Sequence, residues 1–279
     1  MSALLTTTSL TVSVTGRTLV EDLGLTLAPG NRVAVLGPNG VGKTLTLHTL
    51  CGLRTPAAGG VALRGEDLRL LEPRERARRV GLLLQEQEDP FPTTVLETAL
   101  MGRHAQLGVW QWETAEDEAV ARKALDEMDL AGMADREAGT LSGGERRRLG
   151  LASLLVQDPD VLLLDEPLNH LDPSHQFAVL AVLERLAAEG KAIVASLHDP
   201  VLAARHFDSA LLLHGDGRWQ YGPVTELLTA PTLSALYGVA FETYRSDDPT
   251  AAPIMLPTPH AVSGAVDPKV TPLHRRRGR

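Results

Sequence analysis

One short segment has the residue types and spacing of a phosphate-binding loop. It fits the pattern G-x-x-x-x-G-K-[ST] and consists of Gly37, Pro38, Asn39, Gly40, Val41, Gly42, Lys43 and Thr44. Glycines let the backbone curl so that its N–H groups point at phosphate oxygens, and a following helix adds its positive N-terminal end. Lys43 would reach the β- and γ-phosphates, and the Thr44 hydroxyl would bind Mg²⁺. The segment predicts a nucleoside triphosphate site.

Two adjacent carboxylates follow a continuously apolar run. The run is Val161–Leu164, and Asp165 and Glu166 come directly after it. Such a run predicts a buried parallel strand, which delivers both acids to the edge of the sheet where ligands bind in α/β folds. Asp165 would hold Mg²⁺, and Glu166 would polarise the attacking water as a general base. Alone the pair is equally compatible with an acidic loop, but the phosphate loop favours a catalytic site.

A third segment begins a predicted helix and reads Leu141-Ser142-Gly143-Gly144-Glu145. Ser142 is a good N-cap, and Glu145 three residues later completes a capping box. The two glycines weaken a helix, so they indicate that something approaches this backbone closely. Exposed N–H groups and a serine hydroxyl at a helix N-terminus suit a γ-phosphate.

A sheet and helices must position these segments. Alternating apolar residues predict half-buried strands in the first 30 residues, around Leu10–Val14 and Leu23–Leu27. Further strands are predicted at 32–36, 60–64, 80–84, 161–164 and 192–197, and helices from 43 to a stop at Gly52, through most of 85–157, and from 174 to 189. This order predicts an α/β fold with a P-loop NTPase core, an antiparallel β subdomain and an inserted helical subdomain at about 86–157. On the first helix, Lys43 is expected to face solvent when no ligand is bound.

The end of the chain has a different composition. Prolines recur after Ser246, and the last residues are His274-Arg275-Arg276-Arg277-Gly278-Arg279. Such a segment buries too little surface to order itself. We therefore predict one domain over residues 1–245 and a disordered tail over 246–279.

Composition and charge narrow the range of functions. The 279 residues include 27 Lys and Arg against 35 Asp and Glu, a net charge of −8, which disfavours nucleic acid as a partner. Cys51 is the one cysteine, so no intrachain disulfide forms. No apolar run reaches the roughly 18–20 residues of a membrane helix, and the N-terminus lacks the pattern of a signal peptide. We expect a cytoplasmic protein that reaches a membrane only through a partner.

Taken in order along the chain, these motifs resemble the nucleotide-binding subunit of an ATP-binding cassette (ABC) transporter. The resemblance covers roughly residues 3–245 and includes the phosphate loop, the signature motif Leu141–Glu145 and the second acidic motif Val161–Glu166. It also assigns three single positions. Gln85 would bind the metal and link it to the helical subdomain, Asp172 would lie at a dimer interface, and His198 would contact the γ-phosphate.

The resemblance implies a mechanism and partners. Two cassettes would face each other head to tail, with each ATP held between one chain's phosphate loop and the other chain's signature motif. ATP would close this homodimer, and hydrolysis would reopen it and move separate transmembrane permease subunits. A separate substrate-binding protein is implied as well, with the ATPase on the cytoplasmic face of the inner (plasma) membrane.

One position departs from the family pattern. Members of the family usually stack the adenine on an aromatic residue near the first strands, and the matching position here is Val14. No aromatic residue precedes Phe91. The base therefore lacks a stacking partner worth about 0.5–1.5 kcal/mol on the scale of aromatic pairs.

Some segments are similar to one group of importers. They are Asn169–Gln176, Met101–His104, Leu227–Pro231 and Leu236–Val239, which resemble the importer ATPases for iron chelates, haem and cobalamin. Three other functions stay open: a non-transport ABC ATPase that acts on DNA or ribosomes, a nucleotide-dependent assembly module without turnover, and a small-molecule P-loop kinase. The kinase would leave the signature motif unexplained.

Overall fold

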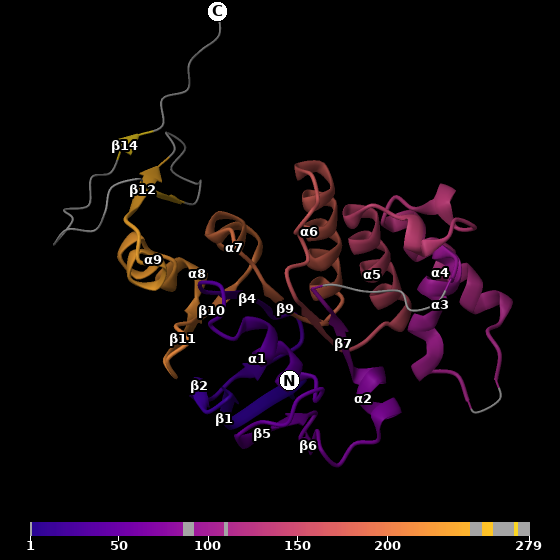
Figure 1. The fold of residues 1–279 in the computed structure, drawn as a ribbon, viewed down its shortest axis with the longest axis horizontal. Helices are drawn as coiled ribbons and strands as arrows, with labels where there is room; N and C mark the ends of the chain where they lie inside the picture. The colour runs from indigo at the N-terminus through magenta and orange to yellow at the C-terminus, as the bar shows by residue number, and fades with distance from the viewer. Residues whose placement is uncertain (1, 86–91, 109–110, 246–252, 259–270, 273–279) are drawn as a thin grey trace, which may run out of the picture.

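The computed structural model describes residues 2–85, 92–108, 111–245, 253–258 and 271–272. Its centre is a six-stranded sheet (Figure 1) with the strand order β11 (Trp219–Pro223), β10 (Ser209–Leu213), β4 (Arg32–Leu36), β9 (Ala192–Ser196), β8 (Val161–Leu164) and β7 (Val80–Leu83). The strands from β10 to β7 run parallel, and β11 pairs antiparallel with β10. The predicted parallel strands are thus confirmed, with ends that agree or differ by one residue.

The central strands are apolar on both faces because each face is covered. In β8, Leu162 and Leu164 belong to one hydrophobic core, whereas Val161 and Leu163 belong to a second core. All four are at most 1% exposed. The continuous apolar run therefore follows from burial on two sides.

An antiparallel sheet covers one side of this centre. Its strands are β1 (Leu5–Val14), β2 (Arg17–Leu23), β3 (Thr26–Leu27), β5 (Ala58–Leu63) and β6 (Glu66–Asp67). The predicted strand over residues 23–27 is wrong in part, because β2 ends at Leu23 and only two residues form β3. The Thr7 hydroxyl donates to the Leu23 carbonyl and accepts from the Leu25 N–H, each at 2.7 Å, so a side chain supplements the backbone bond from the Thr7 N–H to the Leu25 carbonyl (2.8 Å) at this break.

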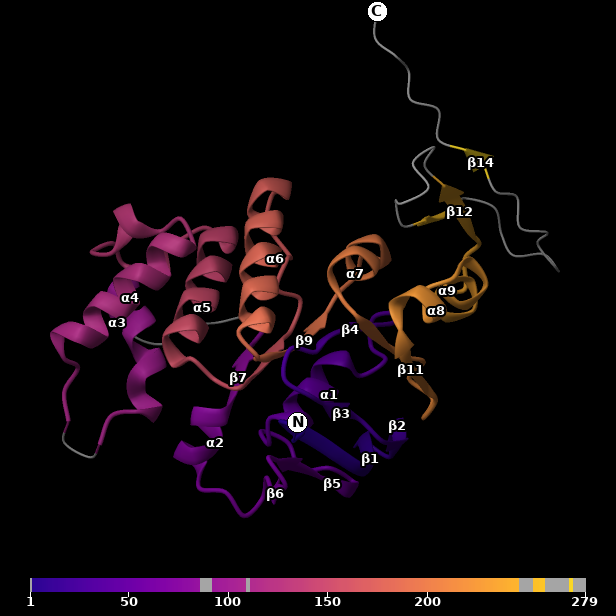
Figure 2. The same cartoon turned by 180° about the vertical axis from the view of Figure 1, so that it is seen from behind.

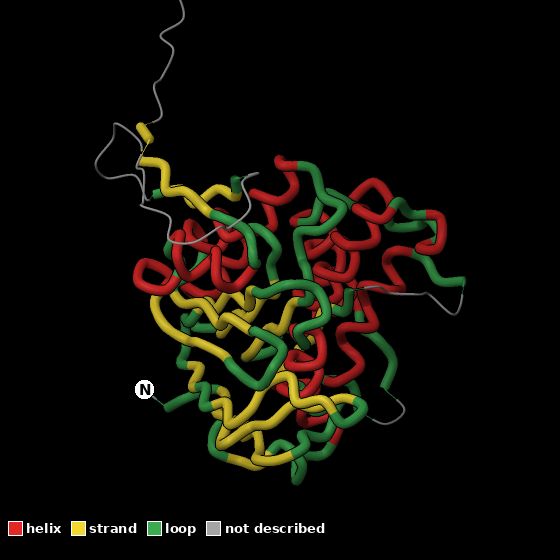
Figure 3. Tube along the Cα trace, turned by 60° about the vertical axis from the view of Figure 1, so that its left-hand side comes forward, coloured by secondary structure: helices red, strands yellow, loops and turns green. Residues whose placement is uncertain are grey.

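Most helices cover the other side of the sheet and its ends, whereas Leu47 and Leu50 of the helix after the phosphate loop join the core on the side of the antiparallel sheet. The predicted helical region contains α3 (Val95–Leu100), η1 (Met101–Ala105), α4 (Ala115–Glu127), η2 (Ala131–Met133), η3 (Ala138–Thr140) and α5 (Gly143–Gln157). Figures 1 and 2 place α3, α4 and α5 together, away from β1 and β2. The other helices are α1 (Lys43–Leu50), α2 (Pro73–Arg79), α6 (Pro173–Ala188), α7 (Pro200–His206), α8 (Val224–Leu227) and α9 (Ala230–Tyr237). Figure 3 separates a strand-rich lower part from a helix-rich upper part.

Part of the predicted tail has regular structure. Strand β12 (Phe241–Arg245) pairs antiparallel with β13 (Ile254–Pro257) and parallel with β14 (Thr271–Pro272). Disorder is therefore the wrong expectation for residues 254–257, where the apolar run Ile254-Met255-Leu256 offsets the flanking prolines and leaves Met255 only 3% exposed. The C-terminal arginines lie outside the described residues. Among the helices that the structure describes, none combines the length and apolar character needed to cross a bilayer.

Candidate functional site

The phosphate loop connects the end of β4 to the start of α1, as predicted. Gly37 and Gly42 have φ values of 152° and 105°, and Gly42 is the N-cap of α1. A Cβ atom at Gly37 would lie 2.4 Å from the Leu213 carbonyl oxygen, so only glycine fits against β10 there. The loop thus presents backbone N–H groups and a helix N-terminus at one place.

Lys43 is not solvent-facing, which corrects the sequence-based expectation. Its side chain folds over the loop, and Nζ donates to the carbonyl oxygens of Gly37 (2.7 Å) and Pro38 (3.1 Å). The residue is only 6% exposed, and burial lowers the pKa of its ammonium group while Glu166 and Asp165 oppose this shift. A periodic pattern cannot reveal this orientation, because it depends on carbonyl oxygens of the preceding loop that have no other hydrogen-bond donor among the described residues and that accept from Lys43.

Thr44 and Asp165 supply oxygen atoms at one point of the site. Thr44 Oγ1 donates to Asp165 Oδ2 at 2.6 Å, and Ser196 Oγ donates to Asp165 Oδ1 at 2.6 Å. Asp165 and Ser196 are fully buried. A hydroxyl and a carboxylate are the hard oxygen ligands that Mg²⁺ prefers. The residues present therefore fit that ion.

Glu166 lies at the centre of a hydrogen-bonded cluster. Its Oε1 is 2.7 Å from His198 Nε2, and its Oε2 accepts from Gln85 Nε2 (3.1 Å) and from Asn169 Nδ2. The backbone of Glu166 has a φ of 53°, which is uncommon for a non-glycine residue and costs on the order of 1–3 kcal/mol. The Glu166 N–H donates to Ser196 Oγ at 2.8 Å and so helps to hold this conformation.

One cavity brings half of the predicted site residues together. Its volume is about 500 Å³, and it is lined by Val14, Leu19, Asn39, Gly40, Gly42, Lys43, Thr44, Leu45, Gln85, Glu166, Asn169 and His198. Phosphate-binding groups, a carboxylate and a histidine therefore share one space. Val14 and Leu19 both line it, so aliphatic side chains lie where the resemblance places the adenine.

An aromatic residue at position 14 should improve nucleotide binding. Replacing Val14 by tyrosine adds a face on which adenine can stack, so we expect Val14→Tyr to tighten ATP binding by up to about tenfold, or roughly 1.4 kcal/mol. Isothermal titration with ATP measures this change. Inorganic pyrophosphate serves as the control, because it has no base and its affinity should not change. Unchanged or weaker ATP binding would mean that another residue holds the base.

The signature motif forms its own hollow. Ser142 Oγ accepts from the Glu145 N–H (3.3 Å), and Glu145 Oε2 accepts from the Ser142 N–H (2.7 Å), so the predicted capping box is present. A Cβ atom at Gly144 would lie 2.9 Å from the His170 carbonyl oxygen, whereas one at Gly143 meets nothing closer than 3.9 Å. At Gly144, the group that approaches the backbone closely is the chain's own loop at His170. At Gly143, no group approaches closely, and the space is open.

Asp172 borders the same hollow and has a clear structural role. It is the N-cap of α6, and its Oδ1 accepts from the His175 N–H (3.0 Å) and from the Ser174 hydroxyl (2.7 Å). These donors hold the pKa of the Asp172 carboxyl well below its usual range. The hollow measures about 440 Å³ and is lined by Ser142, Gly143, Gly144, Glu145, Arg148, His170, Leu171, Asp172 and His175. Within the described residues, its lining shares no member with the cavity around Lys43.

Some residues at the site do not follow from the sequence patterns. Ser196 joins Asp165 to the Glu166 backbone, Asn169 donates to Glu166, and Arg147 reaches the carbonyl of Asp165. Each of the three is close in sequence to a recognised motif. That proximity is the one feature of the sequence that could have identified them as site residues. Their partners are set by the packing of neighbouring strands, which no spacing pattern encodes.

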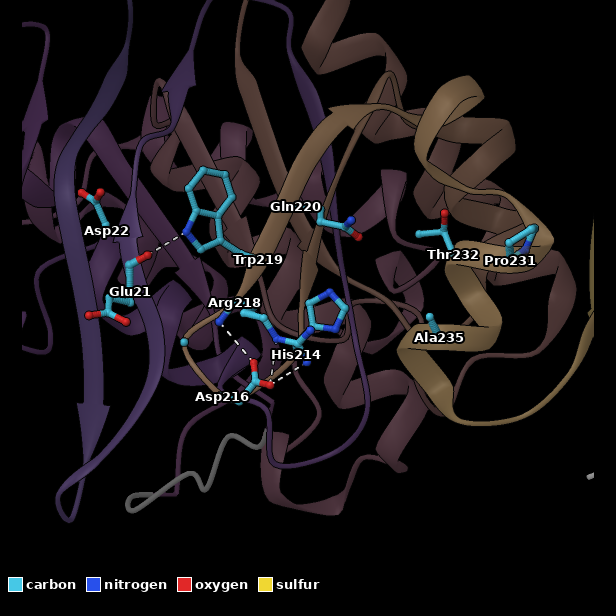
Figure 4. A pocket seen from close by; sticks show the side chains of 11 residues that line it. Glu21, Asp22, His214, Asp216, Arg218, Trp219, Gln220, Pro231, Thr232 and Ala235 are labelled. Atoms are coloured by element: carbon cyan, nitrogen blue, oxygen red, sulfur yellow. Dashed lines mark hydrogen bonds and ion pairs between the residues drawn. The ribbon is translucent and has the colours of Figure 1, made fainter. Parts of the chain in front are cut away.

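A larger cavity lies outside the nucleotide site (Figure 4). It measures about 890 Å³ and is bordered by β2, β11 and α9. Trp219 Nε1 donates to the Glu21 carbonyl at 2.8 Å, and Arg218 pairs with Asp216 at 2.7 Å. None of the predicted site residues lines it, so cavity size alone does not identify the chemistry here.

The chain is similar in sequence to known ABC transporter proteins. The sequence profile described as "ABC transporter" matches residues 20–169. The hemin import ATP-binding protein HmuV of Rhizobium meliloti is 35% identical over 82% of this chain and 89% of that protein. The ferric enterobactin transport ATP-binding protein FepC of Escherichia coli is 36% identical over 86% of this chain and 89% of that protein.

Two further matches extend the comparison. The cobalamin import ATP-binding protein BtuD of Halobacterium salinarum is 37% identical over 94% of this chain, which spans 66% of that protein's length. A solved structure of an ABC transporter described as metal-chelate type, in an inward-facing conformation, has a TM-score of 0.79 and 27% identity over 92% of this chain and 98% of its own. The predicted α/β cassette fold is confirmed, and the chain belongs to the ABC transporter family, among its ATP-binding subunits.

Proposed function

We propose that this chain is the ATP-hydrolysing subunit of a membrane importer, with iron-siderophore, haem or cobalamin as the class of cargo. The observation that carries the proposal is the cavity in which Lys43, Gln85, Glu166 and His198 meet. The names of the similar proteins HmuV, FepC and BtuD support import of these cargoes. An assembly module that does not hydrolyse ATP would not need the hydrogen-bonded cluster around the Glu166 carboxylate.

The geometry supports a division of labour among the site residues. The triphosphate lies along residues 37–44, and Lys43 leaves the loop carbonyls to reach the β- and γ-phosphates. Thr44, Asp165 and Gln85 would hold Mg²⁺, which neutralises developing phosphate charge when bound. Glu166 accepts a proton from the attacking water through its carboxylate, and His198 holds the γ-phosphate beside it.

The two separate linings support a homodimer. Ser142, Gly143, Gly144 and Asp172 border a hollow apart from the chain's own phosphate loop. An exposed helix N-terminus at Ser142 suits the γ-phosphate of a nucleotide carried by a second copy. ATP would close the two copies head to tail. We further propose a permease, a separate substrate-binding protein and a peripheral position on the cytoplasmic face of the inner membrane.

The proposed function is tested by phosphate release and by co-purification. The purified chain should release phosphate from ATP in the presence of Mg²⁺, and it should co-purify with its permease when both are expressed. Turnover by a chain that co-purifies with no membrane protein would favour a non-transport ABC ATPase. Tight ATP binding without turnover, alone or with the permease, would favour an assembly module.

The signature motif can be tested separately from nucleotide binding. Ser142→Arg places a large cation over Gly143, where a second copy's γ-phosphate would lie. We expect ATP binding to the monomer to stay within twofold, whereas ATP-driven dimerisation is lost and turnover falls at least tenfold. The lost N-cap costs about 1 kcal/mol of helix stability, so a melting curve accompanies the assays.

Ala188→Arg is the matched control for Ser142→Arg. Ala188 is exposed at the C-terminal end of α6 and does not line the signature hollow, so the added charge there should change neither dimerisation nor turnover. Loss of ATP binding by the Ser142→Arg monomer would mean that the motif serves the chain's own nucleotide, contrary to the proposal.

A further inference from the structure

Arg147 is a buried cation directly behind the hydrolytic centre. It lies in the first turns of α5, the helix that begins at the signature motif, and it is 7% exposed. One arm of its guanidinium, Nη1, donates to the carbonyls of Leu84 and Gln85 (3.3 Å to Gln85), and the other arm, Nη2, donates to the carbonyl of Asp165. The fork therefore joins the ends of two strands.

These carbonyls lie beyond the last paired residues of the two strands. The ladder between β7 and β8 ends at Leu83 and Leu164, and the Asp165 N–H still donates to the Leu83 carbonyl at 3.0 Å. Beyond this point the chain carries Gln85 on one side and Asp165 and Glu166 on the other. Arg147 replaces the missing ladder at the place where the catalytic side chains leave the sheet.

The neighbouring arginine points the other way. Arg148 donates to the carbonyls of Met128 (2.8 Å) and Asp129 (3.0 Å), which follow α4. The two adjacent side chains thus fasten α5 to the helical region through Arg148 and to the sheet through Arg147. Because α5 starts at Ser142, a displacement of the signature motif is transmitted along one helical turn to Arg147.

The electrostatics suit a fixed cation at this position. Burial lowers the pKa of Arg147 to about 10, and Asp165 and Glu166 oppose the shift. The group therefore stays charged at neutral pH. In the part of the chain that the structure describes, Arg147 forms no ion pair with a carboxylate, so its charge is balanced through space by the two acids and by the three carbonyl dipoles.

We infer that Arg147 is a positioning residue that keeps Gln85 and the Asp165–Glu166 pair in register with the signature helix of the same chain. This inference rests on the proposed ATPase function. It links the two sites of a dimer, because the signature helix that touches a second copy's ATP also sets the geometry of its own chain's Glu166. Arg147 itself touches no nucleotide in this account.

The test measures Kd for ATP, kcat and KM of the full-length chain and its variants. We expect Arg147→Gln to lower kcat at least tenfold while Kd for ATP changes less than threefold, because the phosphate loop is not altered. Arg147→Lys keeps the charge but cannot donate to both strand ends, so its kcat should stay well below that of the parent. Arg122→Gln, which breaks an exposed pair with Glu118, is the control and should leave all three constants unchanged.

A double-mutant cycle separates positioning from general destabilisation. If Arg147 acts through the Gln85 segment, the loss of kcat in the double variant Arg147→Gln with Gln85→Ala should be close to that of the larger single effect. Independent effects would multiply instead and overturn the inference. So would an unchanged kcat in Arg147→Gln, or a loss of kcat that merely follows loss of folded protein in both Arg147 variants.

The same experiment distinguishes this inference from the proposed function. A parent chain and an Arg122→Gln variant that release no phosphate would contradict the ATPase assignment itself. A fully active parent together with a fully active Arg147→Gln would contradict only the role of Arg147.

Discussion

Glu166→Gln should trap an ATP-bound dimer. Glutamine has the shape of glutamate but no basic oxygen, and losing a general base typically costs on the order of 10²–10⁴ in rate. The Gln85 and Asn169 amides donate to one oxygen of Glu166, and a glutamine carbonyl can accept both, so the local structure should persist. Binding of ATP should be kept or improved because a negative charge near the triphosphate is removed. Gel filtration with ATP and Mg²⁺, together with a phosphate-release assay, measures both effects.

Two comparison variants make the Glu166 result specific. Glu189→Gln changes an exposed carboxylate at the end of α6 that pairs with Arg185, and it should behave as the parent does. Asp165→Asn should instead weaken Mg²⁺-dependent binding, because Asp165 faces the Thr44 hydroxyl. If Glu166→Gln hydrolyses ATP within a few-fold of the parent rate, Glu166 is not the base and the assignment of roles to the two acids is wrong.

Lys43→Ala should abolish tight ATP binding and, with it, hydrolysis. A hydrogen bond that involves a charged group contributes about 1.5–3 kcal/mol, so the loss of one such bond to a phosphate weakens binding about ten- to hundredfold. Because Lys43 is buried against the carbonyls of Gly37 and Pro38, its removal also frees those carbonyls. Titration with ATP measures the affinity, and thermal unfolding of the nucleotide-free chain measures the structural cost.

The fold should survive this change. Burial of the Lys43 ammonium group lowers its pKa because the charge loses contact with water. Alanine has no charge to desolvate, so this gain in stability offsets part of the stability lost with the hydrogen bonds. Lys123→Ala removes an exposed lysine on α4 and controls for the change in net charge. Tight ATP binding by a folded Lys43→Ala protein would contradict the assignment of the phosphate loop.

The sequence patterns predict the parts of this structure that depend on local chemistry. The apolar run Val161–Leu164 predicts a strand. Of the two acids that follow it, Glu166 lines the cavity and Asp165 accepts from Thr44 beside it, because parallel strands end at one edge. The capping box at Ser142 depends on a spacing of three residues and is found as predicted. Such features need no knowledge of the rest of the chain.

Features that depend on distant partners could not be predicted. Ser196 meets Asp165 across two neighbouring strands, and the spacing of either residue contains no trace of that contact. Gly144 is close to the backbone of His170, although the glycine alone indicates only that something approaches. The inward fold of Lys43 likewise depends on which carbonyls are free nearby. These arrangements follow from packing, which periodicity does not record.

The strand order gives the walls of the nucleotide cavity unequal resistance to local opening. Among the described strands, β4 and β8, which lead to the phosphate loop and to the acids, have a neighbour on each side, whereas β7 lies at the edge and pairs with β8 alone. Backbone with half the hydrogen-bonding neighbours opens at lower free energy. Gln85 therefore follows the strand that opens more readily, whereas Lys43 follows a strand that is held on both sides. The Arg147 fork, which joins the Gln85 segment to Asp165, therefore lies where the cavity wall needs a second support.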